Sequence, residues 1–420
     1  MRILMVNKFL YPRAGAETYM LRLSESLIKA GHEIAFFGMD HKDKTTLGKT
    51  YTVKQVEFGK HLGKLEKFGQ LFKAGWQNLK IKKIFAECCK DFKPDLIHAH
   101  NVYNQLPPDL FKFIEIPVVM TAHDYKPVCP SYNLFTNGQN CTECLNSNFL
   151  PCIKNKCVQG STLASTISAL SSTYHKIKKT YLDTIDVYVA PSRFMKDKLI
   201  LGGIPSDKIK VINNFTDANS DRAPKGKKGF LYAGRICKEK GLNTLIQAYK
   251  QLPLPRPEMT ICGTGPLKKA MQELSEAEGL NIHWTGYISP DKIVKKMDDA
   301  QAVIVPSIWN ENCSMTIMES LANGRPVIAS DTGGNPELIT HGYDGLIFKS
   351  GDAEDLSLKL SQFLQLDLES ISKNALETGS RFFSTEFHTD QILKLYQNAL
   401  VTKYQNEKHH LPKPCLLQES

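Results

Sequence analysis

Residues 306–348 read PSIWNENCSMTIMESLANGRPVIASDTGGNPELITHGYDGLIF. This stretch decides the fold, because it alternates buried-strand patterns with a helical one. An apolar run at 302–307 has the length of a buried strand, and residues after Ser314 follow helical spacing. Two further apolar runs, 326–330 and 345–348, predict strands. Strands that alternate with helices predict a parallel sheet.

The same pattern occurs at the start of the chain and again near residue 229. Residues 1–40 read as a strand, a glycine turn, a helix that stops at Gly31, and a second strand. GFLYAGRICKEKGLNTLIQAY begins the pattern again at 229. We therefore predict an α/β protein of two doubly wound, Rossmann-like domains facing a central cleft, with the site at the carboxyl ends of the strands. The other predicted strands are 95–100, 117–123, 187–192, 259–263 and 281–286.

The expected domain boundaries follow from these patterns. A stretch rich in Asn, Asp, Lys and Gly separates the two sheets and predicts a linker. A last helical segment is expected to pack back towards the first domain. The expected division is an N-terminal domain 1–200 with a cysteine-rich insert at 129–157, a linker 201–228, a C-terminal domain 229–380 and a final helix 381–405.

Composition excludes several classes of protein. The 420 residues are 42% hydrophobic and 23% charged, which is typical of globular proteins and not of disordered, collagen-like or coiled-coil chains. No run approaches the roughly 18–20 apolar residues that span a bilayer. The first residues, MRILMVNKFLYPRAG, lack the pattern of a signal peptide. We therefore expect a cytoplasmic protein.

The net charge of +10 is unevenly distributed. Residues 1–200 contain 28 Lys and Arg against 17 Asp and Glu, whereas residues 201–420 contain 25 against 26. A basic first half suits an anionic partner, although a merely soluble basic surface would look the same. Residues 60–90 predict a basic amphipathic helix, which suits either an anionic membrane surface or ordinary packing on the sheet.

The chemistry centres on two glutamates. Glu311 is expected in the loop after a strand, and Glu319 in the first turns of the following helix. A carboxylate accepts two hydrogen bonds from a vicinal diol, and the free N–H groups of a helix start suit a diphosphate. A Glu pair alone is a weak signal. It becomes specific with its strand, its helix and the G-G-N-P-E element at 333–337.

With this element, the sequence resembles the family-4 glycosyltransferases, which are retaining enzymes of the GT-B fold. The resemblance covers almost the whole chain. It implies that Glu311 contacts the sugar of a nucleotide-sugar and Glu319 the ribose, and that His123 lies near the donor sugar. It also implies that Arg235 and Lys240 grip the diphosphate. The remaining residues that it assigns to the donor site are Gly15, Gly263, Gly265, Asn312, Cys313, Ser314, Met315 and Thr316.

No catalytic metal is expected. The chain contains no D-x-D triplet, the usual carboxylate clamp for a nucleotide-bound metal. Fixed cations at Arg235 and Lys240 supply the alternative stabilisation of a leaving diphosphate. His98 and His100 end a predicted strand and are further candidates to line the cleft, while Cys313 is interpreted as a small apolar spacer.

Five of the eleven cysteines lie in the insert, with the spacing C-x11-C-x2-C-x7-C-x4-C. In a cytosolic chain this spacing favours a metal over disulfides, and C-x2-C is typical of structural Zn²⁺. Free buried thiols and an iron–sulfur or redox role stay open. The resemblance aligns the fourth ligand with Cys157 and leaves Cys152 spare. The predicted zinc ligands are Cys129, Cys141, Cys144 and Cys157.

The sequence thus predicts a hexosyltransferase-type enzyme that moves a sugar from a UDP- or GDP-linked donor to a glycan or lipid-linked acceptor. Capsule, O-antigen, lipopolysaccharide or exopolysaccharide assembly is the expected setting, with peripheral contact to the inner face of a membrane and no nucleic-acid partner. Two alternatives remain, a sugar-nucleotide epimerase or phosphorylase and a non-enzymatic module that binds zinc and nucleic acid.

Overall fold

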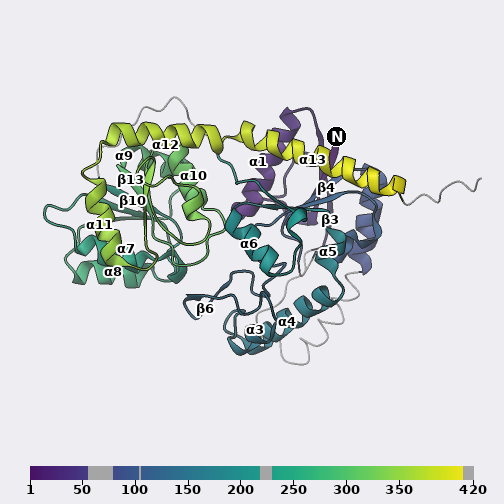
Figure 1. Cartoon of the computed structure of the whole chain (residues 1–420), viewed down its shortest axis with the longest axis horizontal. Helices are drawn as coiled ribbons and strands as arrows, with labels where there is room; N and C mark the ends of the chain where they lie inside the picture. The colour runs from purple at the N-terminus through teal and green to yellow at the C-terminus, as the bar shows by residue number, and fades with distance from the viewer. Residues whose placement is uncertain (55–78, 104–105, 218–228, 410–420) are drawn as a thin grey trace, which may run out of the picture. The chain divides into compact units, whose positions relative to one another are not determined.

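The computed structural model describes residues 1–54, 79–103, 106–217 and 229–409. They form two sheets packed against helices and one small hairpin (Figure 1). The chain divides into two compact units that are interleaved along the sequence. Unit 1 contains Met1–Thr121, Lys179–Val189 and the chain from Thr389 onwards, and unit 2 contains Ala122–Lys178 and Ala190–His388. The linear boundaries expected from the sequence stay a prediction.

A seven-stranded sheet has the order β3-β2-β1-β4-β5-β8-β9, and its strand pairs from β3 to β8 are parallel. The central strands are continuous apolar runs because helices cover their faces. The strands are β1 (Arg2–Phe9), β2 (Glu33–Met39), β3 (Lys49–Val53), β4 (Leu96–Ala99), β5 (Val118–Thr121), β8 (Val187–Ala190) and β9 (Ile209–Val211). The helices of unit 1 are α1 (Gly15–Lys29), a helix at 79–92, η1 (Pro108–Phe113), α5 (Thr180–Thr184) and most of α13 (Thr385–His409).

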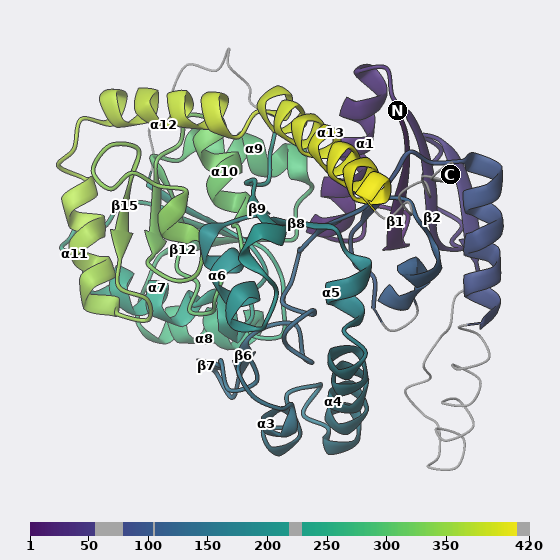
Figure 2. The same cartoon turned by 45° about the vertical axis from the view of Figure 1, so that its right-hand side comes forward.

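The last helix, α13, lies beside α1 in both views (Figures 1 and 2). The hydroxyls of Ser26 in α1 and Thr389 in α13 are 2.6 Å apart. Further along α13, the Tyr396 hydroxyl lies 2.6 Å from His98 Nδ1 at the end of β4. These contacts hold the C-terminal helix within unit 1.

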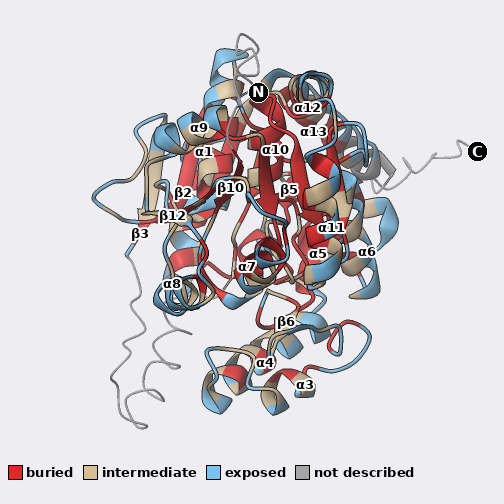
Figure 3. Ribbon diagram, turned by 90° about the vertical axis from the view of Figure 1, so that its left-hand side faces the viewer, coloured by how far each residue is buried: buried red, intermediate tan, exposed pale blue. Residues whose placement is uncertain are grey.

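Unit 2 contains a six-stranded sheet in the order β12-β11-β10-β13-β14-β15, with every neighbouring pair parallel. Two apolar cores cover its two faces, and its central strands β10, β13 and β14 are buried (Figure 3). The strands are β10 (Phe230–Ala233), β11 (Met259–Cys262), β12 (Ile282–Gly286), β13 (Ala302–Val305), β14 (Val327–Ser330) and β15 (Gly345–Phe348). The helices are η3 (Lys238–Lys240), α7 (Leu242–Lys250), α8 (Lys268–Ala277), α9 (Pro290–Asp299), α10 (Met315–Ala322), η4 (Asn335–Glu337), α11 (Ala353–Phe363) and α12 (Leu368–Phe382).

The cysteine-rich segment also belongs to unit 2. Its hairpin β6–β7 is antiparallel, with Phe135 opposite Asn140. Helices α3 and α4 lie side by side in Figures 1 and 2 and share an apolar cluster that includes Phe149 and Ala169. Its elements are β6 (Phe135–Thr136), β7 (Gln139–Asn140) and α3 (Leu150–Lys154), followed by α4 (Thr162–Ile177). Unit 2 also contains α6 (Arg193–Leu201) and η2 (Ser206–Lys208).

The two Rossmann-like domains predicted from the sequence are confirmed. Four short strands were not predicted, namely β3, β9 and the two strands of the β6–β7 hairpin, and β9 lies inside the expected linker. Most of the amphipathic helix expected at 60–90 lies outside the described residues; the described part, 79–92, is helical and buries Ile81 and Phe85. Among the described helices, none combines the length and apolar character needed to cross a membrane.

Candidate active site

A buried ion pair forms the centre of the site in unit 2. The Nζ of Lys240 lies 2.5 Å from Oε1 of Glu311, and the Ser307 hydroxyl donates to the same oxygen at 2.7 Å. Glu311 is only 4% exposed. One carboxylate oxygen therefore receives two hydrogen bonds inside the protein, one of them from a cation.

The charge of Glu311 depends on these partners. Burial alone would raise the pKa of this carboxyl group, because a low-dielectric environment disfavours its charged form. The positive charge of Lys240 and the hydrogen bonds from Lys240 and Ser307 more than offset burial, and they lower the pKa below its ordinary value. Glu311 is therefore an ionised acceptor at neutral pH.

The backbone around η3 delivers Lys240 to the site. Gly241 directly follows Lys240 and has a positive φ of 67°. A Cβ at Gly241 would overlap the carbonyl oxygen of Pro306, so only glycine lets the turn approach the end of β13. The Ile308 N–H donates to the Glu239 carbonyl at 2.9 Å, which ties the two loops together.

The glycines after β14 hold the other side of the Glu311 loop. A Cβ at Gly333, which has a φ of 62°, would overlap the backbone of Glu311. The N–H of Gly334 donates to the Glu311 carbonyl at 2.7 Å. The close approach that Gly333 allows is therefore to the Glu311 backbone.

Gly263 and Gly265 also allow two backbone segments to pack closely, next to Arg235. A Cβ at Gly263 would overlap the Gly234 carbonyl, and one at Gly265 would overlap the Ile236 carbonyl. These glycines thus let the loop after β11 pack on the loop after β10. Arg235 lies in that second loop with its side chain 71% exposed, and its guanidinium is 3.6 Å from Glu239.

His123 is tied to the same region of unit 2 through its backbone. Its carbonyl accepts a hydrogen bond from the Asn312 side chain. Burial lowers the pKa of the His123 imidazole to about 3, so the ring is neutral at physiological pH. Two residues later, the buried Tyr125 hydroxyl donates to the Asn310 carbonyl at 3.2 Å.

Helix α10 begins immediately after this loop. Ser314 is its N-cap, so the N–H groups of Met315 and Thr316 belong to the first turn, which has no carbonyl partners within the helix. Cys313 is buried, and burial raises the pKa of its thiol to about 12, which leaves it protonated. Glu319 lies in α10 and is half-buried. Helix start, carboxylates and cation together offer a set of groups suited to a diphosphate and its sugars.

Other predicted residues lie in unit 1. Gly15 is the first residue of α1, and a Cβ there would meet no atom within 4 Å, so the space around it is open. Glu17 is buried and accepts a hydrogen bond from the Ala14 N–H at 3.1 Å, which closes the first helical turn. His98 was a candidate to line a cleft, but the structure places it in the core. It is fully buried, with Tyr396 and Thr121 at 2.6 and 2.8 Å from its two ring nitrogens.

The four predicted zinc ligands lie together in unit 2, where they line one small cavity with Cys152. In the described ranges, no group of three or more His, Cys, Asp or Glu side chains is arranged to hold a metal ion as it stands.

The sequence did not predict Ser307, which lies in the 306–312 loop, or Tyr125 and Asn140, which contact this loop. The Asn140 amide donates to the Ile308 carbonyl at 3.2 Å and accepts from the Asn310 N–H at 2.9 Å. Ser307 carried a signal, since it ends a predicted strand four residues before Glu311. Tyr125 and Asn140 lie about 170 to 190 residues from their partners, and no local pattern marks them.

Comparison with known proteins identifies the family to which the chain belongs. Residues 13–220 match the family model described as Glycosyltransferase Family 4, and residues 213–378 match the one described as Glycosyl transferases group 1. An uncharacterized protein of the cps region of Klebsiella pneumoniae is 26% identical over 94% of this chain and all of its own length. The sulfoquinovosyl transferase SQD2 of Arabidopsis thaliana is 24% identical over 79% of this chain and 62% of its own length. A putative colanic acid biosynthesis glycosyltransferase, WcaL of Salmonella typhimurium, is 28% identical over 46% of this chain and 52% of its own length.

Solved structures agree on the fold. HepE from Anabaena, in complex with UDP, superposes with a TM-score of 0.67 at 18% identity and covers 95% of this chain and all of its own. The lipopolysaccharide outer core galactosyltransferase WaaB superposes with a TM-score of 0.66 at 18% identity, over 96% of this chain and all of its own. These likenesses confirm the GT-B fold. The two family models together span residues 13–378, and the chain belongs to glycosyltransferase family 4, with the group 1 module in its C-terminal half.

Proposed function

We propose that this glycosyltransferase moves a hexose from a UDP- or GDP-linked donor to a hydroxyl of a glycan or lipid-linked acceptor, with retention of the anomeric configuration. The observation that carries the proposal is the ionised Glu311, paired with Lys240 and bonded to Ser307, directly before the start of α10. Related folds support the nature of the donor, because HepE has been solved with UDP and with UDP-glucose.

Each group takes a role that suits its chemistry. Glu311 accepts hydrogen bonds from the hydroxyls of the donor sugar, and Glu319 accepts them from the ribose diol. Lys240 and Arg235 stabilise the negative charge on the diphosphate, as do the first N–H groups of α10. His123 contributes a neutral imidazole and no charge. The stabilising charges come from the protein, so we propose that the transfer step uses no metal.

The reaction breaks the bond between the sugar C1 and the diphosphate oxygen and forms a bond from C1 to the acceptor oxygen. Retention follows if the acceptor attacks the face that the diphosphate leaves. The released diphosphate oxygen then takes the proton of the acceptor hydroxyl. This route needs no protein general base, and the protein contributes fixed charges and positions.

A donor panel tests the proposal. UDP- and GDP-linked hexoses are incubated with the protein and a lipid-linked glycan acceptor in buffer without added divalent cation, and released nucleoside diphosphate is measured. We expect release from one donor class, and an α-linked product by NMR from an α-linked donor. Interconversion of the free nucleotide-sugar with no diphosphate release would indicate an epimerase and overturn the proposal.

The acceptor side of the proposal rests on the relatives. Their names refer to a cps region and to colanic acid biosynthesis, and a structural neighbour acts in the lipopolysaccharide outer core. We therefore propose a polysaccharide-assembly acceptor, as in capsule, O-antigen or exopolysaccharide synthesis. The donor is a cytoplasmic metabolite class, so the proposed place of action is the cytoplasmic face of a membrane.

Helix α4 supports contact with an anionic membrane surface. One face of α4 is buried through Ser165 and Ala169, and the opposite face exposes a row of apolar side chains. Residues 144–182 contain five Lys and no Asp or Glu, so the charge around this row complements anionic lipid. The exposed apolar residues are Leu163, Ile167, Leu170, Tyr174 and Ile177, and the lysines are Lys154, Lys156, Lys176, Lys178 and Lys179.

A further inference from the structure

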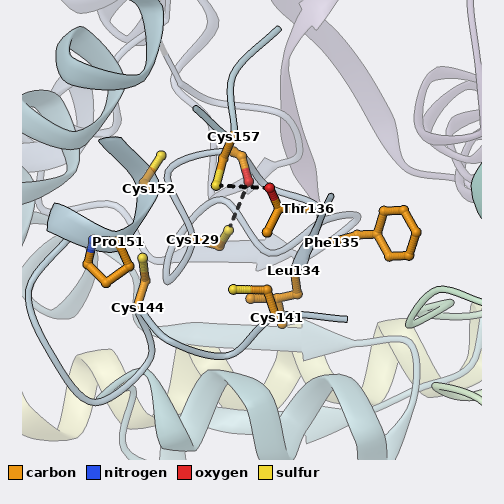
Figure 4. Close-up of a pocket in the computed structure, with 10 residues that line it drawn as sticks. Cys129, Leu134, Phe135, Thr136, Cys141, Cys144, Pro151, Cys152 and Cys157 are labelled. Carbon is orange, nitrogen blue, oxygen red and sulfur yellow. Dashed lines mark hydrogen bonds between the residues drawn. The ribbon is translucent and has the colours of Figure 1, made fainter. Parts of the chain in front are cut away.

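The cysteine-rich segment encloses a cavity of about 10 Å³ that is lined by five cysteines. Figure 4 shows them gathered around one small space between the β6–β7 hairpin and α3. The cavity is about the size of one water molecule, so it admits a single ion and excludes a sugar or nucleotide. The cysteines that line it are Cys129, Cys141, Cys144, Cys152 and Cys157.

The thiols now make weak contacts with neighbouring polar groups. Cys129 Sγ lies 3.3 Å from the Ser131 hydroxyl, and Cys157 Sγ lies 3.5 Å from the Thr136 hydroxyl. Thiolates this close are stable only beside a cation, and Zn²⁺ held by four thiolates at about 2.3 Å is the common case. A bound ion would draw inward the thiols that line this space.

The hairpin that carries Cys141 also grips the loop of Glu311. Asn140 directly precedes Cys141, and its side chain bonds the backbone on both sides of Trp309, at Ile308 and Asn310. These bonds replace the pairing that a neighbouring strand would supply. A shift of the hairpin would therefore also move the backbone around Trp309, which lies two residues before Glu311.

The start of the segment is tied to the same loop. Tyr125 donates to the Asn310 carbonyl, and its own carbonyl accepts from the Cys129 N–H at 2.7 Å. The cavity is thus connected to the 306–312 loop at two points, one through Cys129 and one through Cys141.

We propose that one Zn²⁺ ion, held by Cys129, Cys141, Cys144 and Cys157, fixes the hairpin and thereby positions the 306–312 loop, with Asn140 as the positioning residue. Cys152 packs with Phe149 and Ala169 in the apolar cluster and is the thiol left over. The effect on sugar transfer rests on the proposed function. The metal content and the order of the loop do not rest on the proposed function. The zinc proposal and the proposed glycosyltransferase function can therefore be refuted separately.

Metal analysis of the full chain, purified without chelator, tests the site. We expect about one zinc ion per chain in the wild type and in Cys152→Ala, and a loss of most of it in Cys141→Ser. Absence of zinc from the folded wild type, disulfides among these cysteines by mass spectrometry, or loss of zinc in Cys152→Ala would overturn the assignment.

Hydrogen exchange tests the link to the loop without nucleotide or activity. The Asn310 amide donates to Asn140 Oδ1, so we expect its exchange to accelerate about tenfold or more in Asn140→Ala and in the zinc-stripped wild type. Asn140→Ala keeps every thiol, and its zinc content should not change. Gln139→Ala, an exposed neighbour on the same strand, is the matched control and should exchange like the wild type. Unchanged exchange in Asn140→Ala would contradict the positioning role.

Enzyme kinetics separate positioning from simple stability. We expect Asn140→Ala to lower kcat for donor turnover while thermal stability and zinc content stay near wild type. Asn140→Asp can still accept from the Asn310 N–H but cannot donate to Ile308, so its rate should be intermediate. Equal rates for both variants and the wild type would refute the link between hairpin and catalysis.

Discussion

Glu311 shows how one residue can depend on two others for its charge. Its carboxylate is almost completely removed from water, and the Lys240 ammonium and the Ser307 hydroxyl help to compensate for the lost hydration. A buried pair of this kind contributes little net stability, but removing one partner is costly. Its value therefore lies in holding an ionised acceptor in a fixed place.

Lys240→Met tests this dependence. We expect the free energy of unfolding to fall by about 3 kcal/mol, because the Glu311 charge would stay buried without its cation. Adding Glu311→Gln should recover most of that loss, since the neutral amide no longer needs a cation. Urea unfolding of the two single variants and the double variant gives the comparison, and additive losses would show that the residues act independently.

His388 predicts a pH dependence. Burial lowers the pKa of its imidazole to about 4, although its bond to the Asn213 carbonyl acts the other way. The unfolded chain binds this proton near pH 6.5, so the stabilisation is complete above pH 6.5 and is lost as the pH falls towards 4. His388→Gln should flatten the curve of unfolding free energy against pH by up to about 1.4 kcal/mol per pH unit in that window. An unchanged slope would mean that another group carries the titration.

Among the individual site residues, the sequence predicted those that lie within local motifs. Lys240 and Glu311 stand next to recognisable strand ends and glycine turns, and the structure pairs them. Asn140 and Tyr125 have no such context, because their partners lie far away in the chain. The role of Gly333 was also not predictable, since a glycine motif does not say whether a ligand or another backbone approaches it.

Among the elements, the loops after β10, β11, β13 and β14 fit together only because glycines remove side chains between them. Gly241, Gly263 and Gly333 all have positive φ, and a Cβ at each would overlap a neighbouring carbonyl. The backbone itself is therefore the packing surface at this edge of the sheet. Rigid loops of this kind hold a charged pair without help from larger side chains.

The variant Gly333→Ala tests how much stability is lost when a side chain is added at this backbone contact. Alanine disfavours a φ of 62°, and its methyl group would push against the Glu311 backbone, so we expect a destabilisation of about 1–3 kcal/mol with lower activity. Gly15→Ala is the matched control for stability, because its Cβ meets open space in a helical conformation. Thermal unfolding of both variants makes the comparison, and equal melting temperatures would contradict the packing argument.

Prediction of elements succeeded where apolar runs were continuous. The strands of both sheet centres lie where their apolar runs predicted, since both faces of these strands are buried. Strand β3, KTYTV, lies at a sheet edge with mostly half-exposed residues, so it lacks that run. Strand β9 has only three residues, which are too few for a periodic signal.

For the whole molecule, part of the excess of positive charge in the first half of the sequence surrounds an exposed apolar face of α4. Leu170 and Ile177 on this face are 63% and 74% exposed, and the surrounding sequence is free of acidic residues from 144 to 182. An isolated exposed apolar residue needs no explanation, but a row of five along one helix indicates a surface that is covered in use.

Vesicle co-sedimentation tests membrane contact. We expect the protein to bind vesicles that contain phosphatidylglycerol and to bind pure phosphatidylcholine weakly, with binding reduced by salt. Leu170→Ser with Ile177→Ser should lower the bound fraction. Leu358→Ser removes an equally exposed leucine from α11 and should leave it unchanged. Equal binding by both variants would show that α4 does not contact the bilayer.

We propose that Glu311, Glu319, Lys240 and the start of α10 form a nucleotide-sugar site that needs no catalytic metal. Calorimetric titration with UDP, GDP, ADP and CMP tests it most directly, on the wild type and Glu319→Ala, with and without added Mg²⁺. We predict that UDP or GDP alone binds the wild type, indifferently to Mg²⁺, and that Glu319→Ala weakens binding about tenfold or more, as loss of hydrogen bonds to a charged group implies. A well-folded wild type that binds none of the four nucleotides, or binds only with Mg²⁺, would contradict the account.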